Sequence, residues 1–139
     1  MDHLIQFANN HWQLCLAFVV ILLIIFINEY YSLQQQGKTV TTEAAVALIN
    51  HDDAVVFDLR SADLFKSGHI IHSIRVSKTD FDQPKMDKYK NKPIILVCAR
   101  GIESAALATA LRKKGYTQPM VLAGGFNAWQ TATLPVVKK

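Results

Sequence analysis

Residues 94–104 of this chain read Ile-Ile-Leu-Val-Cys-Ala-Arg-Gly-Ile-Glu-Ser. The continuous apolar run at its start is typical of a strand that is covered on both faces of a parallel sheet. Residues 105–114 predict a helix, because basic side chains fill the last turn and Gly115 follows it. Cys98 is therefore expected in a short loop at a helix N-terminus. Free N–H groups and the helix dipole favour negative charge there, such as a thiolate.

Outward from this stretch, short apolar runs alternate with helical patterns. Such alternation indicates an α/β fold in which helices flank a parallel sheet. Thr42 and Ser61 are the N-cap candidates for two of the helices. The expected strands cover residues 39–41, 54–57, 74–76, 94–97 and 120–122, the expected helices cover 43–50, 62–66, 105–114 and 126–131, and 81–89 has a weak helical pattern.

The N-terminal region has a different composition, because residues 14–27 are all apolar. This run is shorter than the roughly 20 residues that span a bilayer, but Trp12, Tyr30 and Tyr31 extend it with side chains that favour membrane interfaces. A signal peptide is disfavoured, since no Lys or Arg precedes the run and no small-residue cleavage site follows it. We predict a short extracytoplasmic N-terminus (1–11), a transmembrane anchor (12–31), a linker (32–38) and one domain (39–137).

Charge and cysteine content limit the cellular setting. All 15 Lys and Arg residues lie at or after Lys38, so the positive-inside tendency places the domain in the cytoplasm and the N-terminus outside. The only cysteines are Cys15 and Cys98, without CxxC or Cys/His spacing, so neither a disulfide framework nor a metal site is expected. A lone thiol in a polar loop suits a reducing compartment. The basic residues are scattered without interleaved aromatics, so no nucleic-acid partner is expected, whereas the apolar N-terminal run predicts the lipid bilayer as a partner.

Three separated segments together resemble the signatures of one family. Residues 55–60 (Val-Val-Phe-Asp-Leu-Arg) and 65–70 (Phe-Lys-Ser-Gly-His-Ile) resemble the first signature of rhodanese-like sulfurtransferase domains. Cys98, Gly101 and Ser104 resemble the active-site loop, and residues 124–129 (Gly-Gly-Phe-Asn-Ala-Trp) with 134–136 resemble the closing signature. The resemblance covers about residues 38–137. With the apolar N-terminus, the chain resembles the bacterial, inner-membrane-anchored, single-domain type.

This resemblance implies a mostly parallel five-stranded sheet flanked by helices, and sulfurtransferase chemistry. Cys98 would be the nucleophile that carries a sulfane sulfur as a persulfide, without a bound cofactor. The sulfur would come from a small-molecule or protein donor and pass to a thiol or cyanide acceptor. The implied substrate-binding loop comprises Ala99, Arg100, Gly101, Ile102, Glu103 and Ser104, whose backbone N–H groups would cradle the charged sulfur.

Three further residues are expected to support this loop rather than to react. Asp58 and Arg60 are predicted to form an ion pair that shapes the loop. His69 follows Gly68 in an expected turn, where its ring would hydrogen-bond the backbone.

One position departs from the family pattern and keeps other functions open. Many active members carry an arginine five positions after the cysteine, where this chain has Glu103. A carboxylate near a thiolate raises the pKa of the thiol and repels anionic donors such as thiosulfate, whereas Arg100 offers the opposite charge. The alternative is a binding module at the membrane in which Cys98 is incidental. A phosphatase or arsenate reductase is disfavoured, because Ser104 occupies the position where that chemistry needs an arginine.

Overall fold

The computed structural model describes residues 1–35 and 37–138. The chain forms two compact units, Met1–Gln35 and Gln36–Lys139. The predicted linker, residues 32–38, includes Gln36, which lies outside the described residues.

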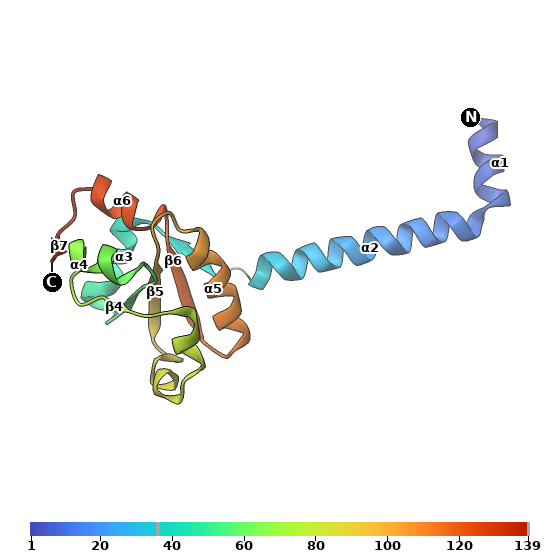
Figure 1. Cartoon of the computed structure of the whole chain (residues 1–139). Coiled ribbons are helices and arrows are strands. Elements are labelled where there is room, and N and C mark those ends of the chain that lie inside the picture. Colours follow the sequence, from blue (N-terminus) through green and yellow to red (C-terminus); the bar gives the residue numbers. More distant parts are fainter. Residues whose placement is uncertain (36, 139) are drawn as a thin grey trace. The chain divides into compact units, whose positions relative to one another are not determined.

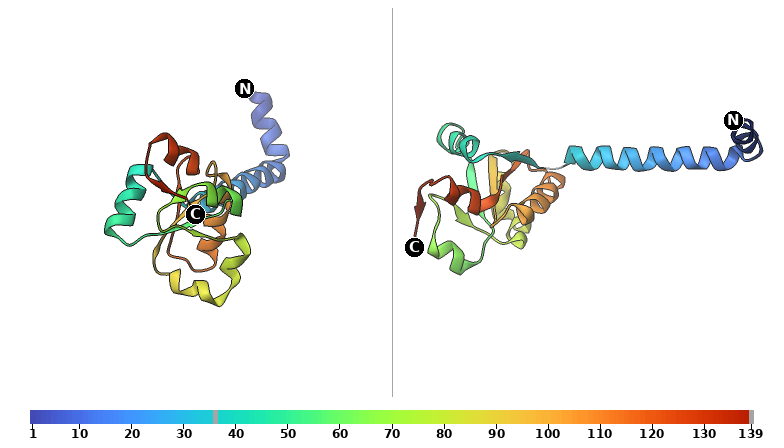
Figure 2. Two further views of the ribbon diagram at one scale, coloured as in Figure 1. Left: turned by 60° about the vertical axis from the view of Figure 1, so that its left-hand side comes forward. Right: turned by 90° about the horizontal axis from the view of Figure 1, so that it is seen from above.

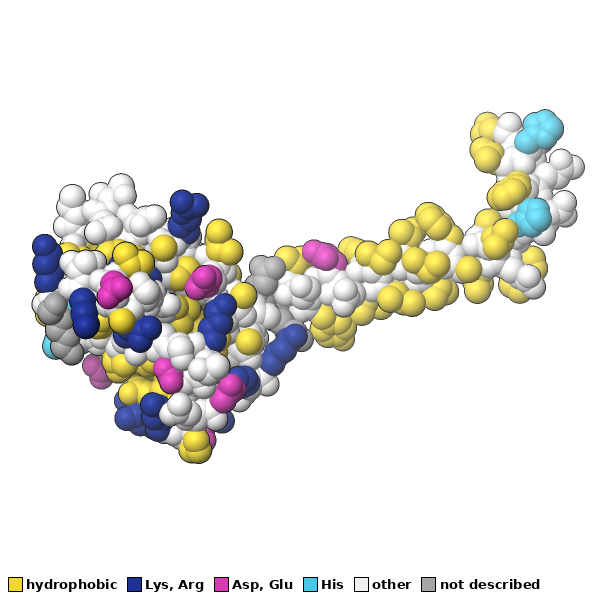
Figure 3. All heavy atoms as spheres, viewed as in Figure 1, with side chains coloured by type: hydrophobic (Ala, Val, Ile, Leu, Met, Phe, Trp, Pro, Cys, Tyr) yellow, Lys and Arg dark blue, Asp and Glu magenta, His cyan; other side chains and the backbone are white. Residues whose placement is uncertain are grey.

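The N-terminal unit consists of helices α1 (Asp2–Asn10) and α2 (Trp12–Gln35) (Figure 1). Apolar side chains cover much of α2 in the space-filling view (Figure 3). Within α2, the 22-residue segment Trp12–Leu33 contains an 18-residue stretch that has a mean hydropathy of 2.3 and is not buried, so its length and composition suffice to cross a membrane. Residues 32–35 of the predicted linker are helical, because Leu and Gln are good helix formers that continue α2.

The C-terminal unit is built on a five-stranded sheet. Its order is β1-β6-β5-β2-β4, and every neighbouring pair is parallel (Figure 1). The predicted five-stranded sheet is therefore confirmed. A small antiparallel ribbon joins β3 to β7 and was not predicted, because two-residue strands carry no periodic pattern. The strands are β1 (Lys38–Val40), β2 (Val55–Asp58), β3 (His69–Ile70), β4 (Ile74–Arg75), β5 (Pro93–Val97), β6 (Gln118–Leu122) and β7 (Val136–Val137).

Two hydrophobic clusters fill the space between the sheet and the helices on its two faces (Figure 2). Successive side chains of a strand point to opposite faces, so Ile94 and Leu96 enter one cluster while Ile95 and Val97 enter the other. Helix α5 and the two 3₁₀ helices cover the first face, and α3 and α6 cover the second. The helices of the C-terminal unit are α3 (Thr42–His51), α4 (Ala62–Ser67), η1 (Lys78–Asp82), η2 (Pro84–Tyr89), α5 (Ile102–Lys113) and α6 (Gly125–Thr131).

Local side chains explain where the helices begin. Ser61 caps α4 as predicted, since its Oγ accepts a hydrogen bond from the Leu64 N–H at 3.4 Å. The cap of α3 is Thr41, which accepts from the Ala44 N–H at 3.2 Å, so the expectation of Thr42 was wrong by one residue. Helix α5 begins at Ile102, earlier than predicted, because Gly101 adopts a left-handed conformation (φ 91°) that turns the chain directly into the helix.

Candidate active site

Cys98 lies at the carboxyl edge of the sheet. It follows β5, whose last residue Val97 is paired with Asp58 at the end of β2. The loops after these two central strands therefore leave the sheet side by side, the usual location of sites in parallel α/β folds. The Cys98 residue is only 4% exposed, so its sulfur lies at the base of the loop and not on its surface.

The loop surrounds the Cys98 sulfur with hydrogen-bond donors. The Gly101 N–H donates to Sγ at 3.0 Å. Ser104 is fully buried, and its hydroxyl has no hydrogen-bond partner within the described part of the chain. Burial raises the pKa of the Cys98 thiol, but the neighbouring Ser104 hydroxyl and the backbone N–H groups of Ser104, Gly101 and Arg100 outweigh burial and hold the pKa below its ordinary value. These donors determine the direction of the shift. The pKa of Cys98 is lowered, although a nearby carboxylate such as Glu103 would by itself raise it.

The lowered pKa predicts how Cys98 reacts with an alkylating agent. A thiolate forms above the pKa, so iodoacetamide should reach its half-maximal rate at a lower pH than with an unperturbed cysteine. Replacing Ser104 with Ala removes one donor to the thiolate and should move this midpoint to higher pH. The measurement is a pH profile of alkylation in a Cys15→Ala background, with Thr109→Ala on the exposed side of α5 as the control. A midpoint unchanged by Ser104→Ala would contradict the assigned role.

The first turn of α6 holds the same loop from the other side. The Phe126 N–H donates to the Cys98 carbonyl at 2.8 Å, and the Asn127 N–H donates to the Ala99 carbonyl at 3.2 Å. This approach needs glycine at position 125, where φ is 63° and a Cβ atom would overlap the backbone of Cys98 and Ala99. The sequence showed the glycine pair only as a turn, so this support of the cysteine loop was missed.

Asp58 and Arg60 form a buried ion pair behind the loop. Arg60 Nη2 lies 2.8 Å from Asp58 Oδ2, and the two side chains are 5% and 1% exposed. The same Nη2 donates to the Gly68 carbonyl at 2.7 Å, and the guanidinium carbon lies 3.6 Å from the centroid of the Phe126 ring. Arg60 thus connects β2 with the end of α4 and with the helix that holds the Cys98 carbonyl.

His69 lies in strand β3 and not in the expected turn, because residues 69–70 pair with Val136–Val137. Its Nδ1 is 2.8 Å from the Phe65 carbonyl, so we assign the proton to Nδ1 as the donor. The ring also stacks on Phe65, with centroids 3.8 Å apart. These contacts hold the strand against α4 and do not involve Cys98.

A cavity of about 510 Å³ opens above the sulfur. Cys98 and Arg60 line it with four residues of the predicted loop, namely Ala99, Arg100, Ile102 and Glu103, whereas Gly101 and Ser104 are not part of the lining. Leu59, Ser61 and Leu64 complete the lining and were not predicted, because they come from a segment that is distant in sequence from Cys98.

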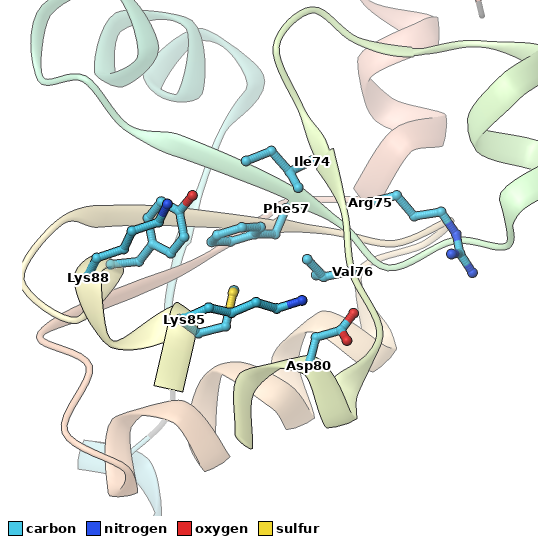
Figure 4. A pocket seen from close by; sticks show the side chains of 9 residues that line it. Phe57, Ile74, Arg75, Val76, Asp80, Lys85 and Lys88 are labelled. Carbon is cyan, nitrogen blue, oxygen red and sulfur yellow. The ribbon is translucent and has the colours of Figure 1, made fainter. Parts of the chain in front are cut away.

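A second cavity, of about 230 Å³, lies beside β4. Basic side chains are part of its lining, but they do not point toward a common centre (Figure 4). Lys85 extends toward Asp80, Arg75 points away from the cavity, and Lys88 lies 5.0 Å from the centroid of the Tyr89 ring. Basic and acidic side chains are also interspersed on the face of the C-terminal unit seen in Figure 3. Within the described residues, no group of three or more His, Cys, Asp or Glu is placed to hold a metal.

The fold and this site define a class of protein: a parallel α/β domain that holds a cysteine in a loop before a helix. The chain belongs to the rhodanese-like domain family, whose model matches residues 41–132.

Similar proteins cover either the whole chain or the C-terminal unit. The uncharacterized protein YibN of Escherichia coli K12 is 35% identical over 141 residues, which cover 99% of both chains. The thiosulfate sulfurtransferase GlpE of Pseudoalteromonas translucida is 30% identical over 95 residues, which cover 68% of this chain and 90% of that protein. A rhodanese-related protein from Thermoplasma volcanium has the same fold, with a TM-score of 0.63 and 22% identity over 73% of this chain and 99% of that chain.

Proposed function

We propose that the protein is a membrane-tethered sulfurtransferase in which Cys98 carries the transferred sulfur as a persulfide. The observation that carries this proposal is the loop itself, whose hydrogen-bond donors lower the pKa of the Cys98 thiol. Membership of the rhodanese-like family and the similarity to GlpE support it. Helix α2 supplies the tether, and the basic C-terminal unit faces the cytoplasm at the inner membrane.

The reaction consists of two displacements at sulfur. First, the Cys98 thiolate attacks the sulfane sulfur of a donor, so that a new S–S bond forms and the donor group leaves with the old bonding pair. The outer persulfide sulfur then carries the negative charge, which the loop N–H groups stabilise. An acceptor thiolate or cyanide next attacks that outer sulfur, and Cys98 leaves as a thiolate. Neither step needs a bound cofactor or an outside oxidant.

The charges around the cavity favour donors of low charge. Arg60 is neutralised by Asp58, while Arg100 and Glu103 contribute one charge of each sign to the lining. The lining therefore has no excess of positive charge to attract a dianion such as thiosulfate. Small or protein-bound persulfides are the donor class that this balance permits.

Exchange of the charge at position 103 tests this proposal. Glu103→Arg should raise kcat/KM for thiosulfate by roughly tenfold, because one unit of attraction replaces one of repulsion near the sulfur. Its effect on a neutral persulfide donor should be much smaller. Thiocyanate formation with cyanide as acceptor measures both, with Glu43→Arg at an exposed position of α3 as the matched control. Activity with both donors that survives in Cys98→Ser would refute the proposed role of Cys98.

A further inference from the structure

The cavity above Cys98 has two exposed apolar side chains in its walls. Leu64 on α4 is 50% exposed and Ile102 at the start of α5 is 75% exposed, and both line the cavity that holds Cys98. Single exposed apolar residues are ordinary on a protein surface. A pair in the walls around a nucleophile instead offers apolar contact to the molecule that brings or takes the sulfur. The group adjoining the reacting sulfur should therefore be apolar.

A smaller cavity adjoins the first and has a different character. Its volume is about 230 Å³, and it shares Arg60, Leu64 and Ala99 with the cavity above Cys98. Exposed Asn127 and Gln130 of α6 line it, together with Ser67. A side-chain amide donates and accepts hydrogen bonds, as the peptide group itself does. A small thiol would fill only the first cavity, whereas an extended polypeptide would reach the second as well.

The charges of this surface also suit an uncharged occupant. The positive charge of Arg100 and the negative charge of Glu103 offset each other. The charge of Arg60 is neutralised by Asp58, whose Oδ2 lies 2.8 Å from Arg60 Nη2. A strongly acidic or strongly basic segment would gain little from such a surface. Neutral polypeptide, with an apolar side chain beside its cysteine, matches both the charge and the apolar walls.

We propose, building on the sulfurtransferase function above, that the sulfur acceptor is a cysteine in an extended, uncharged protein segment with an apolar neighbour. The apolar side chain contacts Leu64 and Ile102, and the flanking backbone reaches Asn127 and Gln130. The partner's thiolate attacks the outer sulfur of the Cys98 persulfide, forming one S–S bond while the bond to Cys98 breaks. Cys98 leaves as a thiolate that the Gly101 N–H stabilises, and the sulfane sulfur is now on the partner, without net oxidation.

Peptide acceptors test this assignment on the full chain in phospholipid nanodiscs. The protein is loaded with sulfur from a small persulfide donor, freed of donor, and mixed with one of three acceptors. These are an uncharged octapeptide with Leu on both sides of its cysteine, the same peptide with Ser at those positions, and dithiothreitol. We expect the Leu peptide to react on the order of tenfold faster than the Ser peptide, as contact with one or two apolar groups would give.

Variants then locate the preference on the protein. Leu64→Ser and Ile102→Ser should each lower the ratio of the Leu-peptide rate to the dithiothreitol rate several-fold. Ile71→Ser, which replaces a 46% exposed apolar residue outside both cavities, should leave that ratio unchanged. The inference would be overturned if the two peptides reacted at equal rates, or if neither Leu64→Ser nor Ile102→Ser changed the ratio of the Leu-peptide rate to the dithiothreitol rate. Either result would leave sulfur transfer by Cys98 intact. Failure of Cys98 to take up sulfur would instead overturn the proposed function on which the inference rests.

Discussion

Replacing Asp58 with Ala is expected to lower the free energy of unfolding of the C-terminal unit by about 3–5 kcal/mol. The substitution leaves the guanidinium of Arg60, whose side chain is 5% exposed, buried without its carboxylate. A buried ion pair adds little net stability, but removal of one partner costs much because the other charge stays desolvated. Urea unfolding followed by the fluorescence of buried Trp129, in a Trp12→Phe background, measures the change.

An exposed ion pair provides the control for this prediction. Asp87 lies 3.0 Å from Lys90, and their side chains are 59% and 37% exposed. Asp87→Ala should therefore cost less than about 1 kcal/mol, since solvent screens such pairs. The double variant Asp58→Ala/Arg60→Met has no unpaired charge and should be more stable than Asp58→Ala alone. A similar, small cost for Asp58→Ala and Asp87→Ala would show that the buried pair does not support the loop.

Gly125→Ala should destabilise the same unit by on the order of 3 kcal/mol and disturb Cys98 as well. The alanine must adopt a φ of 63°, and its Cβ would overlap the carbonyl of Cys98 and the backbone of Ala99. The loop has to move, so the Phe126 N–H loses its 2.8 Å contact with the Cys98 carbonyl. Urea unfolding measures the loss of stability, and the pH profile of alkylation should show the changed environment of the thiol.

A substitution at Gly115 distinguishes the effect of backbone strain from the effect of this steric overlap. It also has a positive φ, 97°, but a Cβ there would meet nothing within 4 Å. Gly115→Ala should cost only about 1 kcal/mol of strain and leave the reactivity of Cys98 unchanged. Should the two variants behave alike in both measurements, the contact between α6 and the cysteine loop would have no special importance.

The sequence predicts the elements of this site better than their mutual contacts. The strand at residues 94–97, the helix after it and the cap at Ser61 follow from neighbouring residues, so local patterns are sufficient. The start of α5 was placed too late because Ile102, Glu103 and Ser104 were assigned to the loop, although Gly101 already turns the chain.

Contacts between distant segments are the part that the sequence could not supply. Leu64 reaches the cavity of Cys98 through the packing of α4, and Gly125 contacts Cys98 from the start of α6. The ribbon of His69–Ile70 with Val136–Val137 joins segments far apart along the chain, which is why His69 was expected in a turn. The net direction of the Cys98 pKa shift likewise depends on four donors whose geometry only the folded loop fixes.

The mass of the intact protein tests most directly whether Cys98 carries sulfur. The wild-type chain and Cys98→Ser would be incubated with a small persulfide donor and freed of donor. Mass spectrometry of the intact protein would then give its mass before and after addition of an acceptor thiol. The account predicts that the wild type gains one sulfur atom and loses it to the acceptor, while Cys98→Ser gains none. No gain by folded wild-type protein with a free Cys98 thiol would contradict the account and favour a binding module at the membrane.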